Sequence, residues 1–246
     1  MIETRQLRKT FNKGKVVAVD DVSFRAMDGQ ITGLLGPNGA GKTTTMRMLY
    51  TLLEPDSGSM QIDGIDPQVE PLKVKRALGV VPDSRGLYDR LTARENIRYY
   101  GKMQGLSSAT INQRIEHFAE TLDMGGFIDR KTDGFSQGQR VKVAITRALI
   151  HDPRTVLLDE PSNGLDVMTT RALRLFLESL KRQGRCVVLS THIMQEVAAL
   201  CDRIVIIAKG RVAAQGTAQE LMEQSGQANL EDAFVNLIGS DEGLLA

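Results

Sequence analysis

The sequence predicts an α/β fold built around a mostly parallel sheet. Short apolar runs typical of buried strands occur at 31–35, 155–159, 186–190 and 204–208, and segments with helical spacing separate them. Alternation of strand and helix along a chain is the pattern of parallel sheets with crossover helices. A chain of 246 residues is long enough to bury a substantial core, and one catalytic unit is the default expectation.

Composition excludes several classes of function. Lys and Arg total 31 against 30 Asp and Glu, so the basic excess of a nucleic-acid-binding protein is missing and we expect no nucleic-acid partner. The two cysteines, Cys186 and Cys201, have neither zinc-site spacing nor disulfide density, which indicates reduced thiols. The densest apolar run, 204–208, is far shorter than the about 20 residues of a membrane-spanning helix. We expect a soluble enzyme whose membrane role, if any, comes through a partner.

The N-terminal part predicts an antiparallel β edge, followed by a strand, a loop and a helix. Apolar and polar residues alternate over 17–19 and 22–26, before a turn at 28–29, as in half-buried strands. The buried run 31–35 then leads into a glycine-rich loop. Helical spacing is expected over 43–53.

The rest of the chain predicts a helical insert and then a return to the sheet. Charged segments with helical spacing over 91–124 indicate the insert. Strand and helix alternate again after Pro153, with a helix at 167–181. A strand at 211–214 precedes a capping-box pair, Thr217 and Glu220, that opens a short helix, and one more helix is expected beyond Gly226.

The most specific motif is the loop at 36–43, Gly-Pro-Asn-Gly-Ala-Gly-Lys-Thr, which fits G-x-x-x-x-G-K-[ST]. Glycines let successive backbone N–H groups surround phosphates without Cβ clashes, Lys42 is placed for the β and γ phosphates, and the Thr43 hydroxyl is placed for Mg²⁺. The following helix directs its positive end at the nucleotide. The predicted ligands are therefore ATP and Mg²⁺, held by Gly36, Pro37, Asn38, Gly39, Ala40, Gly41, Lys42, Thr43 and Thr44.

A chance glycine-rich turn is the alternative interpretation of this loop. An apolar strand precedes it and a helix follows, as the motif requires, and this context favours a P-loop NTPase with a RecA-like core. The loop by itself still leaves kinases, GTPases and motor ATPases open.

A strand that ends in two carboxylates is the second signal. Residues 156–161 read Val-Leu-Leu-Asp-Glu-Pro, which in isolation would be a strand terminated by solvated acids. Beside a P-loop, Asp159 can bind Mg²⁺ through its water shell. Glu160 is then free to act as the general base for the water that attacks the γ-phosphate.

A capped helix separates this chain from other P-loop enzymes. Ser136 and Gln139 form a capping box that opens a helix extending through Ile150. The stretch Phe-Ser-Gln-Gly-Gln at 135–139 resembles the signature of ABC-transporter ATPases, Leu-Ser-Gly-Gly-Gln, and departs from it at Phe135 and Gln137. The alternative interpretation of this stretch is an ordinary capped helix without a role in nucleotide binding.

The resemblance implies a composite site shared by two subunits. In this family the signature of one subunit closes over the ATP held by the other, so Ser136, Gly138 and Gln139 are expected to face the γ-phosphate of a second ATPase subunit. A head-to-tail dimer follows. A helix N-terminus that carries Gly and Ser also suits an anion.

Other family motifs occur in the expected order. Phe11 precedes the first predicted strands where the family has an aromatic residue that stacks on adenine, although a phenylalanine taken in isolation is more often a core residue. Residues 162–166, ending in Asp166, resemble the D-loop. His192 follows a predicted strand and resembles the switch histidine, which would act with Lys42 and Glu160 in catalysis.

Asp83 departs from the family pattern. The family has a glutamine between the core and the helical insert, where it contacts Mg²⁺ and the attacking water, and this chain has Asp83 instead. An aspartate can still be an oxygen ligand for a hard cation, but it is shorter and cannot donate a hydrogen bond when ionised. We therefore assign Thr43, Asp83 and Asp159 to the metal.

The resemblance covers nearly the whole chain and is closest to ATPase subunits of ABC-2-type exporters, in particular the NatA-like group associated with sodium extrusion. The stretches 86–96, 164–168 and 190–197 carry this closer likeness. It implies a separate integral membrane permease, a peripheral location at the cytoplasmic face of the cell membrane, and a permease contact beside Asp83. A drug, lipid or other small molecule is the alternative cargo.

The resemblance also implies one ABC ATPase domain over 1–246. We expect a nucleotide-binding core at 1–84 and 152–225, a helical subdomain with the signature at 85–151, and a C-terminal helix or tail at 226–246. A translation or DNA-repair ABC ATPase would show two cassettes, coiled-coil arms or zinc cysteines. A regulatory module without turnover would lack the base Glu160.

Overall fold

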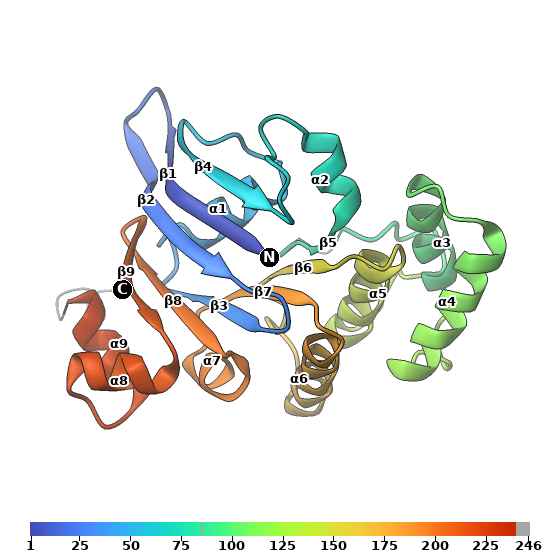
Figure 1. Ribbon diagram of the computed structural model, residues 1–246. Coiled ribbons are helices and arrows are strands. Elements are labelled where there is room, and N and C mark those ends of the chain that lie inside the picture. Colours follow the sequence, from blue (N-terminus) through green and yellow to red (C-terminus); the bar gives the residue numbers. More distant parts are fainter. Residues whose placement is uncertain (85, 240–246) are drawn as a thin grey trace.

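Two sheets and the helices around them make up the computed structural model, which describes residues 1–84 and 86–239 (Figure 1). The last part of the predicted C-terminal helix or tail at 226–246, residues 240–246, therefore lies outside the described residues, as does position 85, where the helical subdomain is expected to begin. Among the described residues, no helix is long and apolar enough to span a membrane.

The larger sheet has six strands in the order β5-β6-β7-β3-β8-β9, counted over the described residues. All neighbouring pairs are parallel except β8 with β9, which are antiparallel. The predicted α/β class is confirmed, because buried strands run side by side while the chain crosses over through helices. The strands are β3 (Ile31–Leu35), β5 (Leu78–Val81), β6 (Thr155–Asp159), β7 (Cys186–Thr191), β8 (Arg203–Ala208) and β9 (Arg211–Gly216).

The predicted antiparallel pairing near the N-terminus is also present, and it belongs to a second, three-stranded sheet. Its strands are β1 (Ile2–Phe11), β2 (Val16–Ala26) and β4 (Ser57–Ile62), in the order β2-β1-β4. The strand β1 was not predicted, and Phe11, which was expected ahead of the first strand, is the last residue of β1. Charged residues interrupt the apolar alternation of 2–11, and register shifts along the β1–β2 pair show the same irregularity.

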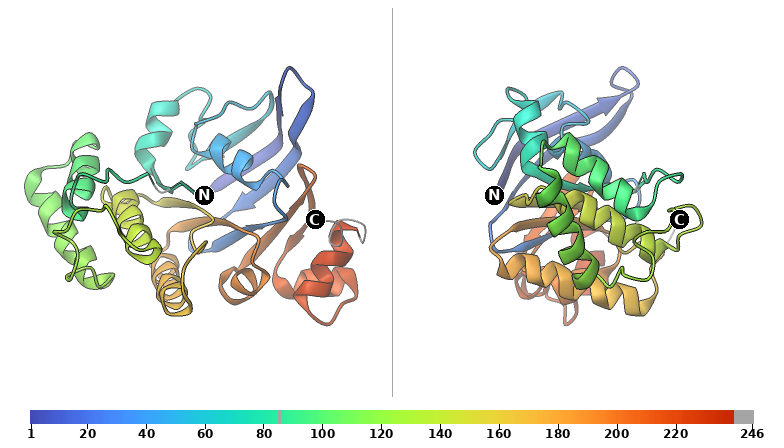
Figure 2. Two further views of the ribbon diagram at one scale, coloured as in Figure 1. Left: turned by 180° about the vertical axis from the view of Figure 1, so that it is seen from behind. Right: turned by 90° about the vertical axis from the view of Figure 1, so that its right-hand side faces the viewer.

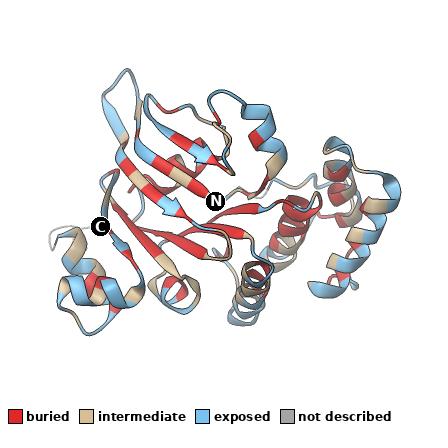
Figure 3. Ribbon diagram, viewed as in Figure 1, coloured by how far each residue is buried: buried red, intermediate tan, exposed pale blue. Residues whose placement is uncertain are grey.

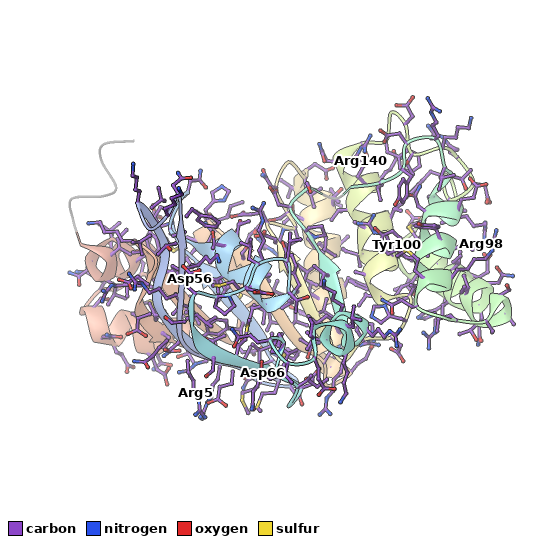
Figure 4. The ribbon with its side chains drawn as sticks, turned by 90° about the horizontal axis from the view of Figure 1, so that it is seen from above. Arg5, Asp56, Asp66, Arg98, Tyr100 and Arg140 are labelled. Atoms are coloured by element: carbon purple, nitrogen blue, oxygen red, sulfur yellow. The ribbon has the colours of Figure 1, made fainter. Side chains whose placement is uncertain are left out.

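Asp56, directly before β4, links that strand to the end of β1 (Figure 4). Its carboxylate accepts hydrogen bonds from Lys9 Nζ at 2.9 Å and from the Thr10 N–H and hydroxyl at 2.7 Å each. These hydrogen bonds, that of Lys9 first, lower the pKa of Asp56 to about 2. The end of β1 is thereby attached to the loop that enters β4.

Helices cover the sheet and flank the glycine-rich loop. The helix α1 begins at the predicted loop end but stops at Leu49 instead of 53, because the chain turns at Thr51, whose φ of 60° is incompatible with a continuing helix. The helix α2 and the strands β4 and β5 were not predicted. The helices of this part are α1 (Lys42–Leu49), α2 (Pro71–Ala77), α6 (Val167–Arg182) and α7 (Met194–Leu200).

The predicted helical insert lies to one side of the sheets (Figures 1 and 2). It contains α3 (Ala93–Met103) and α4 (Ser108–Thr121), and α5 (Gln137–Leu149) leads from it back to the sheet. The insert has a hydrophobic cluster of its own. The fully buried members of this cluster are Ala93, Ile97, Ile111, Ile115, Met124, Val143 and Ile150.

Capping boxes set the start of several helices. The predicted pair Ser136 and Gln139 is confirmed at α5, where the side chain of each accepts from the backbone N–H of the other. The predicted pair Thr217 and Glu220 is confirmed in the same way at α8 (Ala218–Ser225). The final predicted helix is α9 (Leu230–Ile238).

Burial is greatest in three adjacent strands of the larger sheet, one of which, β3, leads to the glycine-rich loop. Every residue of β3, β6 and β7 is buried (Figure 3). The outer faces of α3 and α4 are exposed by comparison. The loop at 36–41 is therefore attached to the most tightly packed part of the molecule.

Leu34→Ala should show how far the core depends on β3. The Leu34 side chain is 0% exposed, so truncation should lower the free energy of unfolding by about 3 kcal/mol through lost apolar burial and a residual cavity. Urea denaturation measures this difference. Leu175→Ala is the matched control, because Leu175 is 58% exposed on α6 and its truncation should change stability by less than about 0.5 kcal/mol. Equal destabilisation by the two variants would contradict the assignment of this core.

Candidate functional site

The site lies where β3, β6 and β7 end. The parallel pairing aligns Leu35 with Thr191 and Asp159 with Ser190, so the segments that follow these strands leave the sheet at one edge. Open parallel sheets bind ligands at this edge, outside the carboxyl ends of their strands. The glycine-rich loop, the Asp159-Glu160 pair and His192 are thus brought together from distant parts of the sequence.

A cavity of about 500 Å³ opens at this edge. Most of the residues that the sequence analysis assigned to nucleotide, metal or catalysis line it. The lining residues are Ala18, Asn38, Gly39, Ala40, Gly41, Lys42, Thr43, Thr44, Asp83, Glu160, Asn163 and His192.

The backbone of the loop requires glycine at particular points. Gly41 has φ 105°, and a Cβ there would lie 2.5 Å from the Ala18 carbonyl oxygen. A Cβ on Gly36 would lie 2.2 Å from the Ile207 carbonyl oxygen. Gly41 is also the N-cap of α1 and provides no side chain to cap it. The start of α1 is therefore shaped to meet an anion with backbone N–H groups, which fits a phosphate.

Lys42 is held inside the cavity wall. It is 5% exposed, and its ammonium group donates to the carbonyl oxygens of Gly36 at 2.7 Å and Pro37 at 3.1 Å. The Glu160 Oε1 atom is 3.5 Å from Lys42 Nζ. Burial lowers the pKa of Lys42, and the negative charge of Glu160 opposes that shift. The cation thus lies between the loop and the carboxylate.

Asp159 is a buried carboxylate with one oxygen satisfied by protein and one not. Its Oδ1 accepts from the hydroxyls of Ser190 at 2.5 Å and Thr43 at 3.3 Å. Its Oδ2 is buried and has no hydrogen-bond partner among the described residues. Burial raises the pKa of Asp159, and hydrogen bonds from Ser190 and Thr43 work against that shift. An unsatisfied buried carboxylate oxygen beside a threonine hydroxyl fits a hard divalent cation.

Glu160 and His192 contact each other across the cavity. His192 Nδ1 lies 2.9 Å from Glu160 Oε2. Glu160 has φ 48°, a left-handed conformation that costs a residue with a Cβ on the order of 1 kcal/mol. The Glu160 N–H donates to the Ser190 hydroxyl at 3.1 Å and to the Ser190 carbonyl at 3.2 Å. Ser190 therefore stabilises the turn that directs Glu160 at His192.

Asp83 connects this cavity to a second one. It follows β5, which pairs with β6 in a register that aligns Val81 with Leu158, so Asp83 reaches the same edge of the sheet as Asp159. Asp83 also lines a separate cavity of about 400 Å³, together with Asp159. The charge of Asp83 contributes to the raised pKa of Asp159, after burial.

Eight predicted residues do not line the nucleotide cavity. Three of them, Gly36, Pro37 and Asp159, accept hydrogen bonds from Lys42 or Thr43, which do line it, and the other five are Phe11, Ser136, Gly138, Gln139 and Asp166. Phe11 is partly exposed at the end of β1, and Ser136, Gly138 and Gln139 lie at the start of α5. Asp166 caps α6 by accepting from the Thr169 N–H at 2.8 Å. Gly138 faces Thr169, where a Cβ would come within 3.1 Å of the threonine methyl group. The nucleotide-contacting roles of these five residues stay predictions.

Three contributors were missed from the sequence. Ala18 and Asn163 line the cavity, and Ser190 organises both Asp159 and Glu160. Ser190 had a signal, because a serine at the end of an otherwise apolar strand is placed at the ligand edge of the sheet. Ala18 had none, since a small residue in a half-buried strand is ordinary.

Known proteins resemble this chain over nearly all of its length. Residues 19–163 match the ABC transporter family, a span that includes the glycine-rich loop, the start of α5 and the Asp159-Glu160 pair. The ABC transporter ATP-binding protein NatA of Bacillus subtilis (strain 168) is 44% identical over 231 residues, which cover 93% of this chain and 94% of NatA. The doxorubicin resistance ATP-binding protein DrrA of Mycobacterium tuberculosis (strain CDC 1551 / Oshkosh) is 37% identical over 243 residues, which cover 95% of this chain and 73% of DrrA.

A solved structure supports the same conclusion. The dimeric ATP-binding cassette MJ0796, in a post-hydrolysis state bound to ADP and Pi, matches with a TM-score of 0.81 and 27% identity, covering 88% of this chain and 98% of that one. The fold, the glycine-rich loop and the acidic pair thus agree with nucleotide binding and ATP hydrolysis. The chain belongs to the ABC transporter family of ATP-binding proteins.

Proposed function

We propose that this chain is the ATP-hydrolysing subunit of an ABC-2-type exporter and that it powers a separate membrane permease. The observation that carries the catalytic part is the contact between Glu160 and His192 at 2.9 Å, in which the other oxygen of Glu160 lies 3.5 Å from Lys42 Nζ. A binding module without turnover would not need a base in this position. The exporter part rests on the likeness to the NatA-like group.

Each residue of the cavity has a defined task in this proposal. The loop and Lys42 bind the phosphates, and Glu160 accepts the proton of the attacking water while His192 keeps its carboxylate oriented. Thr43, Asp83 and Asp159 would hold Mg²⁺, which neutralises charge on the phosphate oxygens when bound. The unsatisfied Asp159 Oδ2 supports this assignment.

A second copy of the chain would complete the site. Ser136, Gly138 and Gln139 lie at the N-terminus of α5, away from the chain's own nucleotide cavity. Val167 and Met168, next to the predicted D-loop, are 83% and 73% exposed, and apolar side chains grouped in this way suit burial against a partner. A head-to-tail arrangement would place the α5 N-terminus of one copy over the phosphates of the other. The dimeric state of MJ0796 supports the association of two copies.

The permease contact is proposed at the second cavity, which has a volume of about 400 Å³. Leu52 and Lys75 line it from the sheet-bearing part. Tyr100 of α3 (Figure 4) and Gln104, the C-cap of α3, line it from the helical insert. Asp83 lines both this cavity and the nucleotide cavity. A permease segment bound here would therefore act on the nucleotide site through one short loop. The chain would be peripheral at the cytoplasmic face of the cell membrane.

Sodium is the proposed cargo, and it rests on the NatA-like likeness alone. A drug, lipid or other small molecule is the alternative, in line with the relative named for doxorubicin resistance. The permease would decide between them, since the described residues of this subunit form no membrane-spanning helix that could line a pathway.

The division of the domain is likewise a proposal. A core at 1–84 and 152–225 with a helical subdomain at 85–151 is supported by the cluster around Ile97, Ile111 and Ile115, whose members all fall between Ala93 and Ile150. The unit at 226–246 is represented by α9, which packs on the cluster around Leu221 and Ile206.

Glu160→Gln should lower ATP turnover by on the order of 10² while ATP still binds, because the amide keeps the shape of the side chain but accepts no proton. Phosphate release at saturating ATP measures turnover, and a fluorescent ATP analogue measures binding. Glu231→Gln, at an exposed position of α9, is the control and should behave as the parent. Unchanged turnover in Glu160→Gln would contradict the assignment of Glu160 as the general base.

Asp83→Gln should raise the Mg²⁺ concentration needed for half-maximal turnover, by roughly five-fold, because a charged oxygen ligand is replaced by a neutral one. At saturating Mg²⁺, the KM for ATP should stay within about two-fold of the parent, since the phosphate loop is untouched. Asp133→Asn removes an exposed carboxylate and serves as the control. An unchanged Mg²⁺ dependence would show that Asp83 does not hold the metal.

Leu52→Glu should release the chain from its permease. Leu52 is 65% exposed at the second cavity, so the change leaves the core intact. It places a charge in the proposed contact with the permease, from which water must be excluded. Purification from membranes should recover an integral membrane protein with the parent chain and much less with the variant, while ATP turnover of the isolated subunit is kept. Leu175→Glu, also at an exposed leucine, is the matched control. Equal recovery with both variants would argue against this contact.

A further inference from the structure

Two segments must be aligned for Glu160 to meet His192. One follows β6 and contains Glu160 and Ser162; the other begins at Thr191, the last residue of β7, and continues to His192. The sheet aligns the two strands only as far as Asp159 and Ser190. Beyond that pair, side chains have to set the distance between the segments.

Glu196 on α7 joins these two segments with a single carboxylate oxygen (Figure 1 shows α7 after β7). Its Oε2 accepts from the Ser162 hydroxyl at 2.6 Å and from the Thr191 hydroxyl at 3.2 Å. Ser162, Thr191 and Glu196 are all buried. The three side chains therefore bridge the segment after Glu160 and the segment that carries His192.

The network also reaches the start of α7. Ile193 is the N-cap of α7 and makes no side-chain cap hydrogen bond. Its N–H donates instead to the Thr191 hydroxyl at 3.0 Å, while that hydroxyl donates to Glu196. His192 lies between Thr191 and Ile193, so the backbone on both sides of it is held by the same network.

The chemistry of this network favours a positioning role over simple packing. A buried carboxylate is unfavourable unless it is hydrogen-bonded, and an apolar residue would fill the same space at lower cost. Hydrogen bonds to a charged group are shorter and stronger than neutral ones. A carboxylate at this point therefore holds the two segments more firmly than packing alone.

We infer that Glu196 is a positioning residue for ATP hydrolysis, which holds the segments at 160–162 and 191–193 at the separation at which Glu160 Oε2 contacts His192 Nδ1. This inference rests on the proposed function of that pair. Glu196 does not line the nucleotide cavity, so it acts through the two segments and not on the nucleotide.

The test is the steady-state ATP turnover of the full-length chain with Glu196→Ala, Glu196→Gln and Ser162→Ala. Glu196→Ala should lower kcat by on the order of 10-fold or more, because small displacements of reacting groups are costly. The KM for ATP should stay within about two-fold, because Lys42 and the glycine-rich loop are unchanged. Glu196→Gln keeps an acceptor oxygen and should restore part of kcat, and Ser162→Ala should lower kcat less than Glu196→Ala.

The double variant Ser162→Ala/Glu196→Ala should be no slower than Glu196→Ala, because both changes remove the same interaction. Gln195→Ala, at an exposed position of the same helix, is the matched control and should keep the parent kcat and KM. Circular dichroism at the assay temperature establishes that each variant is folded. If Glu196→Ala does not fold, Glu196→Gln and Ser162→Ala carry the test.

Folded variants with an unchanged kcat would overturn the inference, and so would a rise in KM with kcat preserved or a double variant with multiplied losses. Failure of the proposed function gives a different result, in which Glu160→Gln itself retains turnover. Loss of turnover in Glu160→Gln combined with full turnover in Glu196→Ala and Ser162→Ala would reject only the role of Glu196.

Discussion

The parallel pairing of β3, β6 and β7 is the constraint on which the site depends. Each strand is buried along its whole length, so a shift of register by one residue would turn its side chains to the opposite face. The pairing places Gly36, Glu160 and His192 just beyond the same sheet edge. In this way the sheet brings to one place segments that lie more than a hundred residues apart in the sequence.

The site brings together charges that the protein compensates only in part. Burial lowers the pKa of Lys42 and raises that of Asp159, which shows that each ionised form is disfavoured by desolvation. Lys42 is partly compensated by Glu160, and Asp159 by two hydroxyls. A phosphate beside Lys42 and a cation beside Asp159 would supply the missing opposite charges. This complementarity explains why the residues suit a nucleotide with its metal better than either alone.

Two parts of the chain carry different groups of predicted site residues. The sheet edge carries the phosphate loop and the acidic pair, whereas α5 connects the helical insert to the sheet and begins at Ser136, away from the chain's own cavity. Asp83 lies between the two cavities. In the proposed function, a partner bound at the second cavity would act on the first through Asp83, and a second copy would supply the N-terminus of its α5.

Local patterns were enough to predict the buried strands, the phosphate loop and the capping boxes at Ser136 and Thr217, because strand burial, loop glycines and helix caps depend on neighbouring residues. They did not predict β1, whose apolar alternation is broken by charges, or the early end of α1, which depends on the conformation of Thr51. The roles of Ser190 and Glu196 also became visible only in the folded chain. Each acts on residues about thirty positions away, and such contacts are set by strand order and helix packing, which no short stretch of sequence specifies.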